Sequence, residues 1–127
     1  MDASQALADL TEISSQIEAA VLFDEQGALL GSTLGSEETA QSFAQAAAEL
    51  LERAAAFRSA GSITQLEAST ADGSVFVVRD HERRIAATTG PTPTVGLVFY
   101  DLKSCLRNAD PPKPKRTRRK KADDDEA

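Results

Sequence analysis

The chain has 127 residues, of which 41% are apolar and 27% charged, a length that allows one domain with a tail but excludes a multidomain enzyme. Its formal net charge is −6, and its single cysteine, Cys105, excludes an internal disulfide framework and a cysteine zinc cluster. No apolar run reaches membrane-spanning length, and Met1 is followed by Asp2 rather than by a basic and then apolar segment, so we expect no signal peptide and a cytoplasmic location.

The chain begins with the pattern of a short amphipathic helix, because apolar residues recur there at intervals of three, three and four. These residues are Leu7, Leu10, Ile13 and Ile17. Residues 19–23 then form a compact apolar run, residues 24–27 have the composition of a turn, and residues 28–31 are apolar again. This succession predicts a β-hairpin after the first helix.

A long helix is predicted next. Ser36 is a suitable N-cap, and Glu37 and Glu38 place negative charge near the positive end of the helix dipole. The helical pattern continues to about residue 60, where Gly61 is expected to end it.

Three strands and a last helix follow in the predicted order. The strands cover residues 63–69, 74–79 and 84–89. Asp72-Gly73 is a strong hairpin signal between the first two, and the apolar, β-branched middle strand is expected in the interior of the sheet. From about Thr94, helical spacing places Val98, Leu102 and Cys105 on one face. The order of elements predicts an α+β fold in which helices flank an antiparallel sheet.

The end of the chain differs from the rest in charge. Residues 1–110 carry seven basic and sixteen acidic side chains, whereas residues 111–127 carry seven basic and four acidic ones. The tail begins with a proline-rich segment and offers nothing to bury, so we predict a domain over residues 1–110 and a disordered basic-then-acidic tail over residues 111–127. The basic residues of this tail are candidates for contacts with a polyanion. They are Lys113, Lys115, Arg116, Arg118, Arg119, Lys120 and Lys121.

The long helix carries two apolar rows where one would suffice to cover a sheet. The large-residue row consists of Phe43, Ala47, Leu50, Ala54 and Phe57. The small-residue row consists of Ala40, Ala44, Ala48, Leu51 and Ala55. Because large side chains suit a sheet and small ones suit a second helix, we expect the large-residue row to face the sheet and the small-residue row to form a twofold dimer interface.

Enzymatic chemistry has little support in the sequence. His81, the only histidine, lies in a predicted turn, and Cys105 lies on an apolar helix face, so a solvated tip and a buried thiol are expected. No phosphate-binding glycine motif occurs, which excludes an NTPase. Five arginines could be lent to a partner GTPase, although surface arginines of an acidic domain mostly pair with nearby carboxylates. They are Arg53, Arg58, Arg79, Arg83 and Arg84.

Four segments together resemble the Roadblock-type domain family, which includes the dynein light chain Roadblock and bacterial MglB-like proteins. They are the apolar hairpin with an acidic turn at residues 20–30, the alanine-rich helix, the strand pair around Asp72-Gly73, and residues 84–87 with 95–102. The resemblance covers about residues 3–109. It implies a five-stranded antiparallel sheet with the long helix on one face and the two terminal helices on the other.

The resemblance also implies a mode of action. Members of the family form homodimers or heterodimers through the long helix and the following edge strand, which here includes Ile63 and Gln65. Bacterial members act beside small Ras-like GTPases as regulators or scaffolds. We therefore expect a non-enzymatic homodimer without a cofactor, with a GTPase contact on the polar side of the long helix at Glu49, Glu52 and Arg53.

Two other functions remain open at this stage. The first is a dimeric adaptor whose basic tail anchors it to nucleic acid or an anionic membrane. The second is a small-molecule sensor, although we expect the alanine-filled faces to leave no large cavity.

Overall fold

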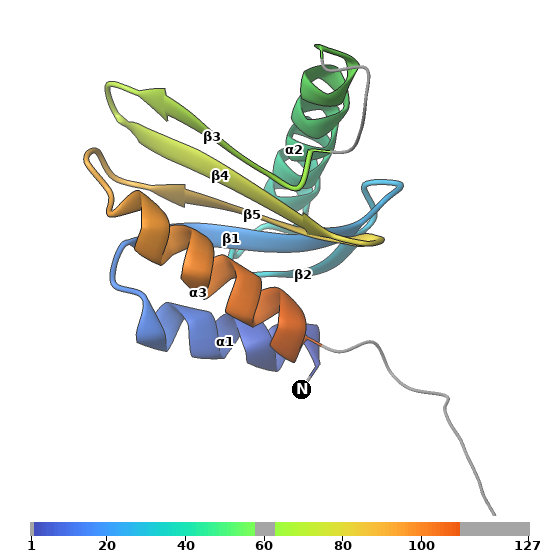
Figure 1. The fold of residues 1–127 in the computed structure, drawn as a ribbon. Coiled ribbons are helices and arrows are strands. Elements are labelled where there is room, and N and C mark those ends of the chain that lie inside the picture. Colours follow the sequence, from blue (N-terminus) through green and yellow to red (C-terminus); the bar gives the residue numbers. More distant parts are fainter. Residues whose placement is uncertain (1, 58–62, 110–127) are drawn as a thin grey trace, which may run out of the picture.

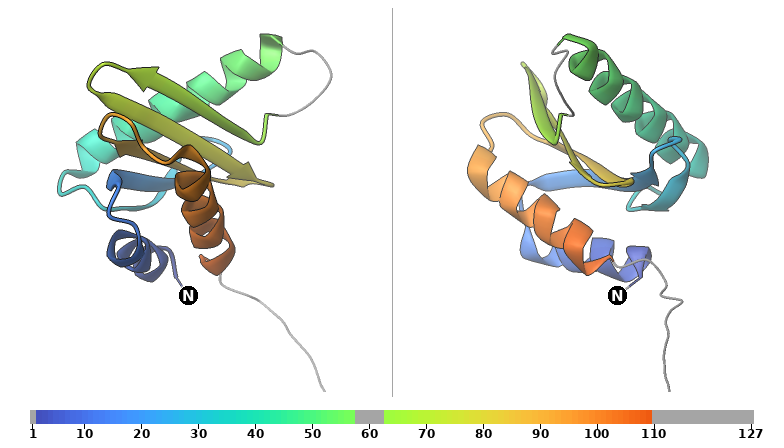
Figure 2. Two further views of the ribbon diagram at one scale, coloured as in Figure 1. Left: turned by 60° about the vertical axis from the view of Figure 1, so that its left-hand side comes forward. Right: turned by 45° about the vertical axis from the view of Figure 1, so that its right-hand side comes forward.

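The computed structural model describes residues 2–57 and 63–109, and these form an antiparallel sheet between two helical layers (Figure 1). The elements in chain order are α1 (Ala3–Ile13), β1 (Ile17–Asp24), β2 (Leu29–Ser32), α2 (Glu37–Phe57), β3 (Gln65–Thr70), β4 (Gly73–Asp80), β5 (Arg83–Thr89) and α3 (Val95–Asn108). The long helix α2 covers one face of the sheet, and α1 and α3 lie side by side on the other (Figure 2). This arrangement confirms the predicted fold class.

The five strands are ordered β2-β1-β5-β4-β3, and every neighbouring pair is antiparallel. Pairing between β1 and β5, from Asp24 opposite Arg83 to Ile17 opposite Thr89, joins the hairpin β1-β2 to the meander β3-β4-β5. The apolar strand β4 is interior, as predicted, and β3 lies at an edge, as the family resemblance implied. The hairpin predicted at Asp72-Gly73 joins β3 to β4. Position 73 requires glycine, because its φ of +155° and the nearby Thr89 carbonyl leave no room for a side chain.

One boundary differs from the sequence prediction. The first helix ends at Ile13, and Ile17 begins β1 instead of continuing the helical face. Ser14 has an extended backbone and its N–H caps the Leu10 carbonyl, which turns the chain into the sheet. Ile13 is consequently 70% exposed, whereas Ile17 is buried from the strand side in the same core as Leu10.

Each face of the sheet has its own apolar core. The core beneath α1 and α3 contains their inward residues and alternate residues of the strands, including Leu7, Leu22, Phe76, Ile85 and Leu102. The core beneath α2 is smaller and contains Val21, Phe23, Ala40, Ala44, Ala47, Leu51, Val77 and Ala86. Adjacent residues of one strand point to opposite faces, so β1 and β4 supply bulky side chains to both cores.

The orientation of α2 is opposite to the predicted one. The residues of α2 that are buried against the sheet are Ala40, Ala44, Ala47 and Leu51, three of which belong to the small-residue row. In the large-residue row only Ala47 is buried, and Phe57 is 92% exposed. The sheet presents Phe23, Val21 and Val77 to the helix, so small helical residues complete the packing where large ones would collide.

The substitution Ala44→Leu tests this orientation. Ala44 is fully buried between α2 and the sheet, so a larger side chain should overpack the core and destabilise the protein by about 1–3 kcal/mol. Ala46 is exposed two positions along the same helix, and Ala46→Leu should change the stability by no more than about 0.5 kcal/mol. Urea unfolding followed by circular dichroism measures both. Equal effects of the two substitutions would contradict the observed orientation.

Candidate functional site

The residues predicted for the dimer interface separate into two groups. Ala40, Ala44 and Leu51 are core residues of the chain itself, so their assignment to an interface between chains is wrong. The reason is that a pattern of small side chains permits close approach to a sheet as readily as to a second helix. Ala48 and Ala55 are partly buried at the margin of α2, Ile63 precedes β3, and Gln65 is exposed on that edge strand.

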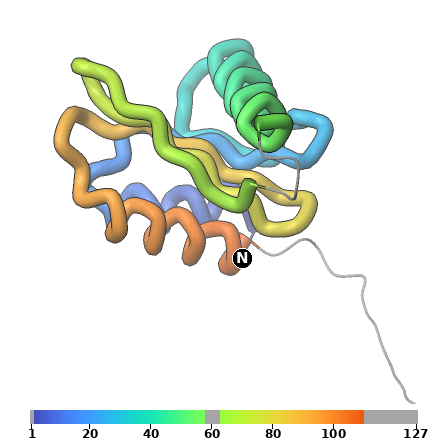
Figure 3. The backbone as a smooth tube through the Cα atoms, turned by 45° about the horizontal axis from the view of Figure 1, so that its top comes forward, coloured from blue at the N-terminus to red at the C-terminus, as the bar shows by residue number. Residues whose placement is uncertain are grey.

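A different flank of α2 is apolar and incompletely covered. Phe43, Leu50 and Ala54 are partly buried, and Phe57 is almost fully exposed. Helix α2 lies mainly over β1, β2 and β5, so the same face of β3 and β4 is incompletely covered as well (Figure 3). Leu66 and Val75 are half-buried there. The apolar surface left uncovered on this side of α2 therefore belongs mainly to the large-residue row.

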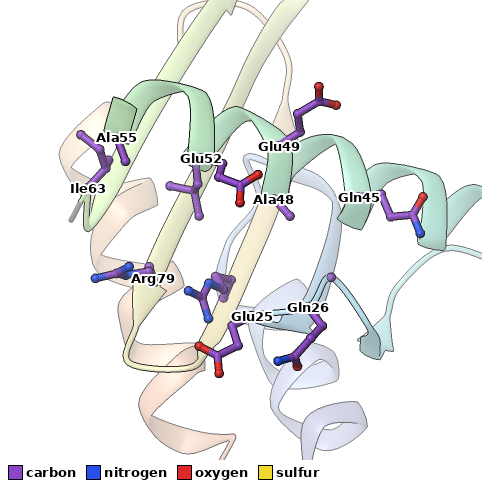
Figure 4. Close-up of a pocket in the computed structure, with 12 residues that line it drawn as sticks. Glu25, Gln26, Gln45, Ala48, Glu49, Glu52, Ala55, Ile63 and Arg79 are labelled. Atoms are coloured by element: carbon purple, nitrogen blue, oxygen red, sulfur yellow. The ribbon is translucent and has the colours of Figure 1, made fainter. Parts of the chain in front are cut away.

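The opposite flank of α2 borders an open recess of about 810 Å³ (Figure 4). Its walls come from α2, the β1-β2 turn, the residue before β3, and the ends of β4 and β5. Carbon surfaces of Ala48, Leu51, Ala55 and Ile63 line the recess together with polar side chains. The expectation that alanine-rich faces leave no large cavity is therefore wrong, because short side chains at the helix margin do not reach the strand ends.

Two arginines form the floor of this recess. Arg79 of β4 and Arg84 of β5 are opposite each other in the antiparallel register. The pKa of the Arg84 guanidinium is lowered, chiefly by desolvation and then by the positive charge of Arg79. The carboxylates of Glu25, Asp24 and Glu82 act in the opposite direction. Arg84 Nη1 donates a hydrogen bond to the Glu82 carbonyl at 2.6 Å.

Sequence reasoning considered these arginines singly and missed the pair. The signal was present, because a two-residue turn at His81 and Glu82 places Arg79 opposite Arg84 by counting outward from the turn. Since both line a recess between the helix and the sheet, they are not placed as projecting side chains that could reach into a partner's active site.

The residues predicted to contact a GTPase lie together on α2. Arg53 and Glu49 form an ion pair at 2.9 Å one turn apart, with side chains 78% and 58% exposed. Glu49 and Glu52 also line the recess. The three therefore form a charged surface that begins at the rim of the recess and continues to solvent. The tail residues from Lys113 to Lys121, predicted to contact a polyanion, lie outside the described residues.

His81 lies at the exposed tip of the β4-β5 turn, with a left-handed φ of 60° and Nε2 3.6 Å from Asp80. Its side chain is 91% exposed, as expected for a solvated turn. Within residues 2–57 and 63–109, no three His, Cys, Asp or Glu side chains are arranged to hold a metal ion. No helix in the same ranges is both long enough and apolar enough to cross a bilayer.

Comparison with known proteins relates this geometry to solved structures. No model of a protein family matches the sequence, and no curated protein matches it. A Roadblock/LC7 domain from Streptomyces avermitilis is similar in structure, with a TM-score of 0.75, 18% identity, and coverage of 85% of this chain and 94% of that one. The chain has the Roadblock/LC7 fold.

Two MglB structures extend the likeness. The gliding protein MglB from Thermus thermophilus has a TM-score of 0.71 at 13% identity, with 84% of each chain covered. An MglB structure described as having a tetrameric arrangement has a TM-score of 0.73, also at 13% identity and with 84% of each chain covered. At these identities the Roadblock/LC7 likeness concerns the fold.

In this Roadblock/LC7 fold, Cys105 of α3 is buried against α1, and its Sγ donates a weak hydrogen bond to the Ala6 carbonyl at 3.5 Å. Burial, with a smaller contribution from the charge of Asp9, raises the pKa of the thiol from 9.0 to about 11. A thiol that resists ionisation is a poor nucleophile, so the predicted structural role of Cys105 agrees with its environment.

The raised pKa of Cys105 predicts a loss of stability at alkaline pH. The unfolded thiol ionises around its ordinary pKa of 9.0, whereas the folded one stays protonated to about 11. Between these values the unfolded state has bound fewer protons, so the free energy of unfolding falls as pH rises, by at most about 1.4 kcal/mol per pH unit. The variant Cys105→Ser keeps a donor to Ala6 but does not titrate in this range. Urea unfolding from about pH 8 to about pH 10.5 should show a steeper decline for the wild type. Parallel declines would contradict the assignment.

Proposed function

We propose that this chain is a non-enzymatic, homodimeric regulator or scaffold of a small Ras-like GTPase. The observation that supports the proposal most directly is the Roadblock/LC7 fold itself, since the family resemblance links this fold to partnership with such GTPases. The two flanks of α2 suit the two required contacts, because one is apolar and the other is charged.

Self-association would use the apolar flank of α2 and the edge strand β3. An exposed Phe57 beside the partly covered Phe43 and Leu50 gains from burial in an interface. The free edge of β3 offers backbone donors and acceptors to a second strand. A twofold axis on this side of the molecule would place the apolar flank and β3 of one chain against the same surfaces of a second chain, which is the usual geometry of a homodimer. The similar MglB structure described as tetrameric supports association through this fold.

The substitution Phe57→Glu should disrupt the proposed dimer. Each interface would contain two copies of Phe57, and losing about 1.5–3 kcal/mol at each weakens the association roughly 100-fold or more. Gln45→Glu, on the opposite flank and also exposed, is the matched control and should leave the association unchanged. Sedimentation velocity over a concentration series measures both variants. A monomeric wild type at micromolar concentration, or an undisturbed Phe57→Glu dimer, would reject this interface.

The GTPase contact would use the charged surface of Glu49, Glu52 and Arg53. Glu49 and Arg53 lie one helical turn apart on the exposed side of α2 and form an ion pair, and Glu52 lies in the same turn. Exposed charges of this kind steer association and fix its register more than they add affinity. Glu49 and Glu52 lie on the recess side of the helix, whereas Arg53 lies one turn from Leu50 and Phe57 and borders the apolar flank.

Charge reversal at Arg53 tests the GTPase contact. Calorimetry with candidate Ras-like GTPases, loaded with GDP or with a GTP analogue, should show binding to one nucleotide state over the other. Arg53→Glu should weaken that binding by about tenfold, because it breaks the pair with Glu49 and reverses the local charge. Arg107→Glu, on an exposed position of α3 in the other helical layer, is the control.

The same experiment separates this function from the adaptor alternative. A chain ending at Asp110 should keep the nucleotide-dependent binding, since α2 and the sheet precede that residue. If no candidate GTPase binds, the regulator proposal is wrong. If binding requires residues 111–127, the folded domain is not the recognition element and the adaptor function is favoured.

A further inference from the structure

The recess beside α2 has a floor made by two guanidinium groups. Val77 and Ala86 face α2, and residues two positions further along each strand point to the same side of the sheet. Arg79 and Arg84 therefore project together into the space under the helix margin, where both line the recess. The strand register fixes the backbone positions of the two residues opposite each other.

No described carboxylate forms a close ion pair with these guanidiniums, although Glu25, Asp24 and Glu82 are near enough to raise the pKa of Arg84. Among residues 2–57 and 63–109, the contacts within 4.0 Å between basic and acidic side chains join Arg53 to Glu49 and His81 to Asp80, and none involves Arg79 or Arg84. In the same part of the chain, the Nε of Arg79 is buried and has no hydrogen-bond partner. Two neighbouring, partly desolvated cations repel each other, and an anion held between them would remove that repulsion.

The surroundings favour a singly charged anion over a phosphate. Glu25 and Glu52 line the recess, and their negative charges oppose a ligand with two or more negative charges. Glu49 contributes less because it pairs with Arg53, and its carboxylate points away from Arg79 in Figure 4. A carboxylate has one negative charge, and its two oxygens match the paired donors of a guanidinium.

The remaining walls suit an apolar body attached to that carboxylate. Leu51, Ala55 and Ile63 contribute carbon surfaces to the same recess. A volume of about 810 Å³ falls in the range of small-molecule sites, and the apolar part of this recess adjoins polar side chains such as Gln26 and Gln45.

We propose that this recess is a binding site for a small apolar monocarboxylate, whose carboxylate is held by Arg79 and Arg84 and whose hydrocarbon part packs against α2 and Ile63. The site uses residues of a single chain and does not depend on the proposed GTPase partner. It lies on the opposite side of α2 from the proposed dimer contact, so it is open in a homodimer formed through the apolar flank.

Hexanoate is a suitable probe, with hexanamide as a neutral control of the same length and inorganic phosphate as a control of higher charge. Titrations of the full chain, followed by protein NMR, should show saturable shifts of residues around the recess with hexanoate. Hexanamide and phosphate should each bind at least about tenfold more weakly.

Variants locate the binding. Arg79→Gln and Arg84→Gln should each raise the Kd for hexanoate by about tenfold, because one of the two guanidiniums is lost. Arg107→Gln, on an exposed position of α3 in the other helical layer, should leave it within about twofold. Ala55→Asp adds a fourth carboxylate to the wall without replacing either arginine, so it should also weaken binding. It keeps the test decisive if either arginine variant fails to fold.

Three results with the unmodified chain would overturn the proposal. They are the absence of saturable hexanoate binding, equal affinities for hexanoate and hexanamide, and equal or tighter binding of phosphate. Hexanoate binding that persists unchanged in the arginine variants and in Ala55→Asp would place the ligand elsewhere and would also overturn it. The GTPase measurements do not enter this test, so the two proposals fail independently.

Discussion

The packing of small residues of α2 against large residues of the sheet determines how the rest of the molecule is presented. Ala40 and Ala44 have no side chain beyond Cβ, so the helix backbone can approach Val21 and Phe23 closely. The Gln41 side chain fixes this approach by donating from Nε2 to the Gly27 carbonyl at 2.8 Å. Once the alanines face the sheet, helical geometry places the large-residue row on one flank and the charged residues on the other.

The β4-β5 hairpin imposes a second constraint, which acts through register. Its two-residue turn requires a left-handed backbone at His81 and pairs Asp80 with Arg83 and Arg79 with Arg84. Pairing two arginines directly across neighbouring strands is unfavourable in itself, because like charges repel. A short hairpin therefore holds an electrostatically unfavourable arrangement under the margin of α2, where Arg84 is also partly desolvated.

Periodicity was sufficient to predict the helices and strands, and the family resemblance supplied the placement of the helices on the two faces. Neither gave the orientation of α2 about its own axis. Alternation and turn residues such as Asp72-Gly73 determine the strands locally, so the succession of strands along the chain could be predicted. The two apolar rows of α2 are equivalent in a count of apolar residues, and only the shapes of Phe23 and Val77 across the interface select the alanines. Ile17 shows the same limit, since its spacing fits a helix until Ser14 ends it. The recess was missed because it arises where short side chains meet strand ends.

The difference between the flanks of α2 has a consequence for regulation. A second copy on the apolar flank would leave the recess open, whereas a partner on Glu49, Glu52 and Arg53 would approach the rim of the recess. A bound carboxylate would neutralise part of the charge of Arg79 and Arg84 and would leave the surface above them more negative. Through thermodynamic linkage, a partner that is sensitive to this charge would change the affinity for the carboxylate by the same factor. The charged flank would then couple the two proposed ligands, while the apolar flank would serve assembly alone.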